Sequence, residues 1–208
     1  SIKNEVRIEK NQKTINKKKY YLIENLEQID NWITEAEELG EVVVDTETNS
    51  LDPHQADLVG VSLSSKIGKA CYIPIGHKSN KCIEKDLVLK KLKPLLEDPS
   101  IKKIGQNIKF DFIVFFKHGI NMTSMEDTML MSYVLDAGKN RHNMDTLSEI
   151  HLNHKTISFK DLVGTGKKEI NFSEVDVEKA KDYAAEDADI TFRLYKKFQK
   201  SLKDEKMI

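Results

Sequence analysis

Three short segments that follow one another closely constrain the fold most. They read EVVVDTET at 41–48, LVGVSLSS at 58–65 and KACYIPIG at 69–76, and a turn containing Gly68 joins the last two. Runs of this length, rich in β-branched residues and bounded by turn residues, are typical of strands, and strands joined by short links pair antiparallel. We therefore predict a sheet at the centre of the fold. Its first strand contains VVV and is expected to be central and buried.

Helical patterns surround these strands. Residues 23–39 carry apolar side chains at helical spacing and end at Gly40, a residue that favours helix termination. A short strand, KKIGQN, is predicted at 102–107, and the remaining helices at 86–96, 110–118, 127–135, 145–152 and about 177–203. Strands first, followed by helices and one more strand, indicate a layered α/β domain with a mixed sheet.

Composition excludes several classes of protein. No apolar run approaches the roughly 18 residues that a membrane span needs, and the opening SIKNEVRIEK has no apolar core, so it is not a signal peptide. Two cysteines, Cys71 and Cys82, are too few for a disulfide scaffold and indicate free thiols in a reducing cytoplasm. A net charge of −1 over 208 residues argues against a simple basic protein that binds polyanions.

The start of the chain differs in charge from the rest. Its first twenty residues carry seven basic and two acidic side chains, a net charge of +5, which leaves −6 on residues 21–208. Such a segment is either a solvated tail or interdomain linker, or a contact to a nucleic-acid backbone. We divide the chain accordingly into a basic lead-in or linker at 1–19 and one domain at 20–208.

Three groups of polar side chains stand out. Asp45 and Glu47, two apart near the end of a buried strand, project from the same face and would repel each other unless a cation lies between them. Asn107 and Asp111 follow the short strand, at the sheet edge where sites of α/β proteins collect; Asp111 could equally favour the positive end of a helix.

Tyr183 and Asp187, four apart, share one face of the last helix. Alanines run along that side, so Asp187 is expected to face inward and to need a basic partner or a metal. The neighbouring acidic residues, by contrast, are expected to be solvated; they are Asp182, Glu186 and Asp189.

Together Asp45, Glu47, Asp111 and Asp187 form an all-oxygen set of ligands. Hard oxygen ligands suit Mg²⁺ or Mn²⁺ rather than Zn²⁺. Two such divalent ions about 3.5–4 Å apart activate a water on one side of a phosphodiester and stabilise the leaving 3′-oxygen on the other. Tyr183, with an unperturbed pKa of about 10, suits orienting that water better than deprotonating it.

DTETNSL, GQNIKFD and YAAEDAD, in this order, resemble the three motifs of the DEDD 3′–5′ exonuclease superfamily, in its tyrosine subclass. The histidine subclass has its histidine where this chain has Asp182. Intervening stretches such as YIPIGH, LKPLLED, DTMLMSYVLDAGKNRHNMDTLSE and HKTISF are similar to the proofreading domain of bacterial DNA polymerase I, from about residue 20 to 204. The resemblance implies a ribonuclease H-like (DnaQ-like) fold with a mixed five-stranded sheet flanked by helices.

Carried over residue by residue, the resemblance implies metal ligation by the four carboxylates and a water-holding role for Tyr183. Leu51 matches a leucine that wedges between the terminal bases, and Phe159 an aromatic that stacks near the 3′ end. From the residues alone, Leu51 is ambiguous, and Phe159 is either a stacking platform beside lysines or a core aromatic. Three further residues match polar residues of the family that contact the DNA strand: Gln106, Asn107 and Arg141.

The complete acid set implies an active, metal-dependent 3′–5′ exodeoxyribonuclease. It would remove nucleotides from a single-stranded or frayed DNA 3′ end and release 5′-nucleoside monophosphates, using two divalent ions, Mg²⁺ or Mn²⁺. The 208 residues leave no room for a polymerase, so we expect either a fragment of a longer polymerase, with the polymerase domain as partner, or a free-standing enzyme. The non-Met start fits an excised linker, and we expect a monomer with no membrane partner.

Two rivals stay open. The first is an exoribonuclease resembling ribonuclease D, which would share the chemistry, and the second is a non-catalytic structural or DNA-binding module, against which the complete acid set argues. LVGTGKK at 162–168 lacks the glycine and hydroxyl of a P-loop and is interpreted as a basic loop. Three histidines lack metal-ligand spacing with any cysteine and are expected at the surface or at helix caps: His142, His151 and His154.

Overall fold

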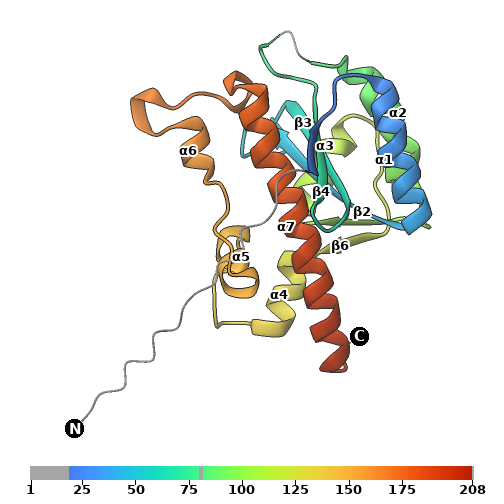
Figure 1. The fold of residues 1–208 in the computed structure, drawn as a ribbon, viewed down its shortest axis with the longest axis vertical. Coiled ribbons are helices and arrows are strands. Elements are labelled where there is room, and N and C mark those ends of the chain that lie inside the picture. The colour runs from blue at the N-terminus through green and yellow to red at the C-terminus, as the bar shows by residue number, and fades with distance from the viewer. Residues whose placement is uncertain (1–18, 80–81, 208) are drawn as a thin grey trace.

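A six-stranded sheet forms the middle layer of the computed structural model, which describes residues 19–79 and 82–207 (Figure 1). The sheet order is β1-β4-β3-β2-β5-β6. As predicted, β2, β3 and β4 pair antiparallel, whereas β5 and β6 continue the sheet in parallel. The mixed α/β class is confirmed, with one strand more than the five expected. The strands are β1 (Tyr20–Leu22), β2 (Glu41–Thr48), β3 (Leu58–Lys66), β4 (Lys69–Pro74), β5 (Lys102–Gly105) and β6 (Met125–Asp127).

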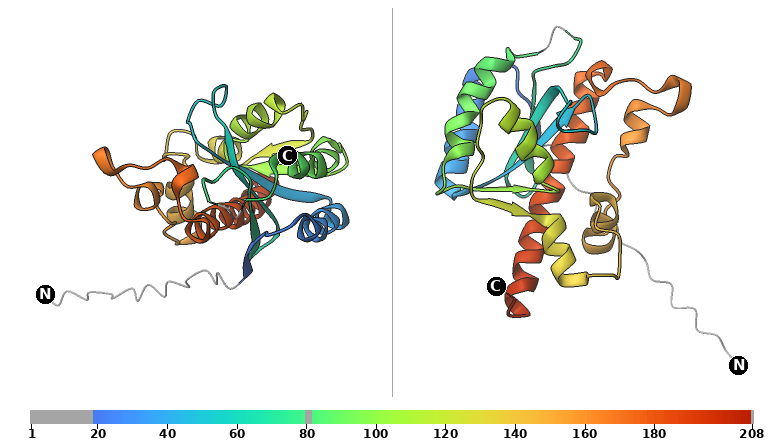
Figure 2. Two further views of the ribbon diagram at one scale, coloured as in Figure 1. Left: turned by 90° about the horizontal axis from the view of Figure 1, so that it is seen from above. Right: turned by 180° about the vertical axis from the view of Figure 1, so that it is seen from behind.

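Helices cover both faces of the sheet (Figures 1 and 2). One face packs against α1 (Leu26–Leu39), α2 (Lys85–Glu97) and α3 (Lys109–Lys117). The other packs against α4 (Thr128–Asp136), α5 (Met144–Leu152) and the long α7 (Val177–Asp204). Between α5 and α7 the chain forms α6 (Phe159–Val163) and two short 3₁₀ turns, η2 (Gly166–Lys168) and η3 (Phe172–Glu174).

Short segments account for the differences from the predicted boundaries. The helix predicted at 23–39 begins at Leu26, because Tyr20–Leu22 pair with β4 and Asn25 then caps the helix. The strand predicted at 102–107 ends at Gly105, because Asn107 takes a left-handed conformation (φ 61°) that turns the chain into α3. Three residues beside β5 form β6, which is too short for alternation to reveal.

Small side chains allow α7 to lie close to the sheet. Strand register puts Gly60 and Ser62 of β3 opposite Glu47 and Asp45 of β2, on the face that α7 covers. On α7 the facing side chains include Ala180, Ala184 and Ala188, all fully buried. Because the facing residues are small, Tyr72 of β4 fits over Gly60, and the helix still approaches the sheet closely enough for its polar residues to reach those of β2.

Two carboxylates predicted to be solvated are instead fully buried in α7. Asp189 accepts hydrogen bonds from the hydroxyl of Tyr20 (2.7 Å) and the backbone N–H of Gly68 (2.7 Å). Glu186 accepts from the backbone N–H of Ile157 (2.6 Å). The expectation failed because β1, the β3–β4 turn and the segment before α6 also pack around this helix. Asp182 is exposed, as predicted.

Other predictions have mixed outcomes. Except for Lys19, the basic lead-in at 1–19 lies outside the described residues. Residues 162–168 span the end of α6, a loop and η2, with no strand before them, in agreement with the rejection of a P-loop. Both cysteines are free. In the part of the chain that the structure describes, no helix combines the length and apolar character needed to cross a membrane.

Candidate active site

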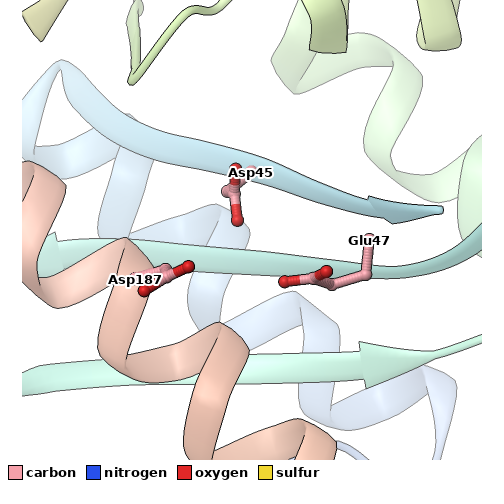
Figure 3. A group of neighbouring side chains, drawn as sticks. All are labelled: Asp45, Glu47 and Asp187. Carbon is pink, nitrogen blue, oxygen red and sulfur yellow. The ribbon is translucent and has the colours of Figure 1, made fainter. Parts of the chain in front are cut away.

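Three carboxylates from two elements converge on the face of the sheet that α7 covers. Asp45 and Glu47 project from β2, and Asp187 projects from α7 toward them (Figure 3). Each offers an oxygen within 4.8 Å of the others. The i, i+2 spacing on the strand places the first two side by side, and the close approach of α7 supplies the third.

In these buried surroundings, three ionised carboxylates without a compensating positive charge are energetically unfavourable. Burial raises the pKa of Asp45 to about 7, only partly offset by its hydrogen bond to the backbone of Thr46. Burial and then the charge of Asp45 raise the pKa of Glu47 and of Asp187. No basic side chain forms an ion pair with these three in the described ranges. An all-oxygen, uncompensated donor set of this kind fits a hard divalent cation.

Asp111 lies next to this group but is held separately. It is buried in the first turn of α3, and its Oδ1 accepts from the backbone N–H (2.9 Å) and the hydroxyl (2.6 Å) of Thr46. Burial, and then the charge of Asp45, raise its pKa. Sequence reasoning missed Thr46; its position between Asp45 and Glu47, pointing to the opposite face of β2, was the available signal.

Tyr183 lies one turn before Asp187 on the same face of α7, close enough for the two side chains to interact electrostatically. Burial and the charge of Asp187 raise the pKa of Tyr183 well above 10, so the phenol stays protonated at neutral pH. Its ring also packs against Phe159 and Phe172, with centroids 6.0 and 6.2 Å away. The hydroxyl is thus fixed beside the carboxylates.

A pocket of about 620 Å³ opens beside this cluster. Leu51, 93% exposed, and Phe159, 41% exposed, both line it. Phe159 stacks on the buried Phe172 with an angle of 4° between the rings, so it is a surface aromatic rather than a core residue. Thr46 to Leu51, Phe110, Tyr183 and residues 169–172 complete the lining.

The three residues predicted as polar contacts lie in two loops, before α3 and between α4 and α5. The Gln106 side chain donates to the His142 carbonyl (2.8 Å) and accepts from Thr128 (2.5 Å). Asn107 donates its backbone N–H to Asp127 (2.9 Å) in the left-handed turn before α3. Arg141 is exposed in the α4–α5 loop.

The histidine expectations hold only in part. His142, expected at the surface or at a cap, is only 7% exposed, because Tyr133 covers its ring (centroids 3.7 Å) and Ser132 contacts its Nδ1 (2.8 Å). His154 contacts Glu186 through Nε2 (3.0 Å). Neither lies in the carboxylate cluster.

Comparison with known proteins gives one consistent result. A family model described as 3′–5′ exonuclease matches residues 20–203. DNA polymerase I of Rhizobium leguminosarum is 44% identical over 198 residues, which covers 85% of this chain and 19% of the relative. DNA polymerase I of Pseudomonas aeruginosa is 44% identical over 172 residues, 80% of this chain and 19% of the relative. The chain thus spans about a fifth of the length of the curated relatives it matches.

Solved structures agree on the fold. Brucella melitensis NrnC with bound Mg²⁺ superposes with a TM-score of 0.60 at 26% identity, over 80% of this chain and 75% of that one. Escherichia coli RNase D, an exoribonuclease, superposes with a TM-score of 0.61 at 17% identity, over 86% of this chain and 44% of that one. These neighbours confirm the ribonuclease H-like, DnaQ-like fold.

Proposed function

Because the chain belongs to the 3′–5′ exonuclease family represented in bacterial DNA polymerase I, we propose that its carboxylate cluster hydrolyses the last phosphodiester of a DNA 3′ end and releases a 5′-nucleoside monophosphate. The observation that carries this proposal is the convergence of Asp45, Glu47 and Asp187 within 4.8 Å, with no basic side chain in the described part of the chain paired to them.

Four carboxylates would hold the divalent ions that are typical of this family: Asp45, Glu47, Asp111 and Asp187. When bound, two such ions supply Lewis-acid activation of the attacking water and stabilisation of the leaving 3′-oxygen. Mg²⁺ and Mn²⁺ both suit the oxygen ligands. Thr46 keeps one oxygen of Asp111 engaged and so orients the other.

Tyr183 orients the attacking water. Its raised pKa keeps the hydroxyl protonated, and the packing of its ring against Phe159 and Phe172 holds it beside Asp187, so the phenol positions the water and does not accept its proton. Leu51 and Phe159 line the adjacent pocket and would receive the terminal base, Leu51 from its exposed loop and Phe159 through its ring. Gln106, Asn107 and Arg141 would contact the DNA strand that precedes the terminal nucleotide.

A frayed or single-stranded end is the substrate that this arrangement favours, because the terminal base must leave its stack to reach the pocket. A mispaired end frays more easily, so selectivity would arise without reading the base. We also propose that the partner is the polymerase domain of a longer chain, and that the domain acts as a monomer in the bacterial cytoplasm, where both of its cysteines stay free.

The test is degradation of single-stranded DNA labelled at its 5′ end. We expect a ladder that shortens from the 3′ end with Mg²⁺, and no shortening with EDTA or with the Asp45→Ala variant, whose circular dichroism spectrum should match that of the native protein. A ladder from Asp45→Ala would contradict the metal-site assignment. RNA of the same sequence, run alongside, tests the exoribonuclease alternative: faster loss of RNA than of DNA would contradict the proposed substrate.

A further inference from the structure

A buried polar group without a partner lies on the β3 side of the carboxylate site. Ser62 is in the middle of β3, and its side chain is fully buried. Its Oγ has no hydrogen-bond partner among the residues that the structure describes. A hydroxyl can donate one hydrogen bond and accept two, and burying it without a partner costs stability. A hydroxyl retained at such a position therefore calls for a functional explanation.

Strand register places this hydroxyl beside Asp45. The two residues are direct cross-strand partners in the antiparallel pair of β2 and β3. Side chains of such partners project from the same face of the sheet, with their Cβ atoms about 4.5–5.5 Å apart. Rotation about χ1 is enough to turn a serine hydroxyl toward a carboxylate at that separation. Ser62 thus adjoins one of the three carboxylates whose oxygens converge within 4.8 Å.

The neighbour of Ser62 on its other side is already engaged. On β4 its cross-strand partner is Tyr72. The Tyr72 hydroxyl is displaced two residues along β3, over Gly60, and contacts Nε2 of His77 at 2.7 Å. Of the two side chains that flank Ser62 in register, Asp45 is therefore the one whose acceptor oxygens remain for its hydroxyl.

We propose that Ser62 is a positioning residue of the site: its hydroxyl donates a hydrogen bond to the Asp45 carboxylate when that carboxylate holds a divalent cation. This inference rests on the proposed function, which assigns the cations to Asp45. A carboxylate has two oxygens with about four acceptor positions, so ligation of a cation leaves room for another donor. Such a donor fixes the orientation of the ligand and raises metal affinity. Thr46 engages Asp111 in a comparable way.

Ser62→Ala tests this role, with Ser65→Ala as the matched control. Ser65 is on the same strand, is also buried, and its Oγ likewise has no partner among the described residues. It lies three residues farther along β3, beyond the pairing of Val43 with Ser64. Calorimetric titration with Mn²⁺ alone, without DNA, gives the dissociation constant of the metal. The melting temperature in EDTA gives the stability of the metal-free protein.

We expect Ser62→Ala to weaken Mn²⁺ binding about tenfold. Its melting temperature in EDTA should equal or exceed the native value, because the variant loses a buried hydroxyl that had no partner. Ser65→Ala should bind Mn²⁺ as the native protein does. Unchanged Mn²⁺ affinity in Ser62→Ala would overturn the proposal, as would equal weakening in both variants. A lower melting temperature of Ser62→Ala in EDTA would also overturn it, since that is the effect of a purely structural serine.

Failure of this inference can be told apart from failure of the proposed function. A native protein that binds Mn²⁺ and cleaves no DNA would overturn the proposed function, while the comparison of Ser62→Ala with Ser65→Ala would still decide the role of Ser62. A native protein that cleaves DNA, together with native Mn²⁺ affinity in Ser62→Ala, would overturn the role of Ser62 alone. A native protein that binds no Mn²⁺ would overturn both.

Discussion

At the scale of single residues, the buried carboxylates of the candidate site lower the stability of the metal-free protein. The pKa of Asp45 is raised to about 7 by burial, and its charge raises the pKa of Glu47 and Asp187. When a carboxyl has a higher pKa in the folded than in the unfolded state, stability falls as the pH rises from the unfolded pKa through the folded one. The metal-free protein should therefore be least stable above neutral pH.

Asp45→Asn should accordingly stabilise the metal-free protein. We expect its melting temperature in EDTA at about pH 8 to rise by about 2–4 °C, as for a gain of about 1 kcal/mol in a domain of this size. At about pH 5, where the native carboxyl is protonated, the gain should shrink. Scanning calorimetry measures both, with the exposed Asp182→Asn as control. A melting temperature at or below the native value at the higher pH would refute this account.

Thr46 offers a second test at this scale. Its hydroxyl donates to Asp111 at 2.6 Å, in addition to its backbone N–H. Thr46→Val keeps the shape of the side chain and removes the donor, so we expect the cleavage rate to fall about 10- to 100-fold, as when the partner of a metal-ligating group is lost. Thr46→Ser keeps the donor and should retain most activity. Equal rates for the two variants would show that the hydroxyl does not position Asp111.

At the scale of elements, local spacing predicted much of the site. Asp45 and Glu47 follow from alternation on one strand, and Asp187 from the alanine-lined face of one helix. The burial of Glu186 and Asp189 could not be predicted in this way, because their partners lie 29 and 169 residues away, at Ile157 and Tyr20. Periodicity identifies one packed face of a helix, whereas α7 is covered on several sides.

A histidine connects the end of β4 to the segment between η3 and α7. His77, after β4, contacts the Tyr72 hydroxyl through Nε2 (2.7 Å) and the Val175 carbonyl through Nδ1 (3.2 Å). A neutral ring protonated on Nδ1 serves both contacts: Nδ1–H donates to the carbonyl, and Nε2 accepts from the Tyr72 hydroxyl. Burial, the largest cause, lowers the pKa of His77. The segment from η3 to α7 is thus tied to β4 by an uncharged imidazole.

This tie should weaken in acid. Above about pH 6.5 the ring is neutral in both states; below it the unfolded chain takes up a proton that the folded protein resists, so stability is lost. When the pH falls from about 7 to about 5, the free energy of unfolding of the native protein should decrease. That of His77→Gln should decrease by up to about 1 kcal/mol less. Urea unfolding at both pH values measures this, with the exposed His54→Gln as control. Identical pH dependence for native protein and His77→Gln would contradict the assignment.

At the scale of the whole molecule, segments far apart in sequence meet around the site. The loop after β2 is joined to η3 where the Asn171 side chain donates to the Asn49 carbonyl (3.0 Å). Lys78 pairs with Glu174 at 2.7 Å and holds the same region to β4. The sequence motifs predict the chemistry of the site. The pocket, however, forms only when these distant segments pack together beside the sheet.

Net charge limits how the proposed DNA substrate can be bound. Residues 21–208 carry a net charge of −6, since the first twenty residues contribute +5 to the total of −1. The carboxylate cluster adds local repulsion of a phosphate, and Arg141 has no ion pair among the described residues. Affinity must therefore come from bound cations, stacking and a few basic contacts, rather than from a broad positive surface.

Salt and metal should accordingly act very differently on binding. With about two or three phosphate contacts, the logarithm of affinity for single-stranded DNA should fall with the logarithm of salt with a slope of about −1 to −2. Removing Mg²⁺ with EDTA should weaken binding by more than a rise from about 50 to 200 mM salt does, because it restores the uncompensated carboxylates. Anisotropy titrations of a strand whose 3′-terminal phosphorothioate resists cleavage measure both effects. A steep slope with no response to Mg²⁺ would mean that DNA binds an extended basic surface away from the carboxylates.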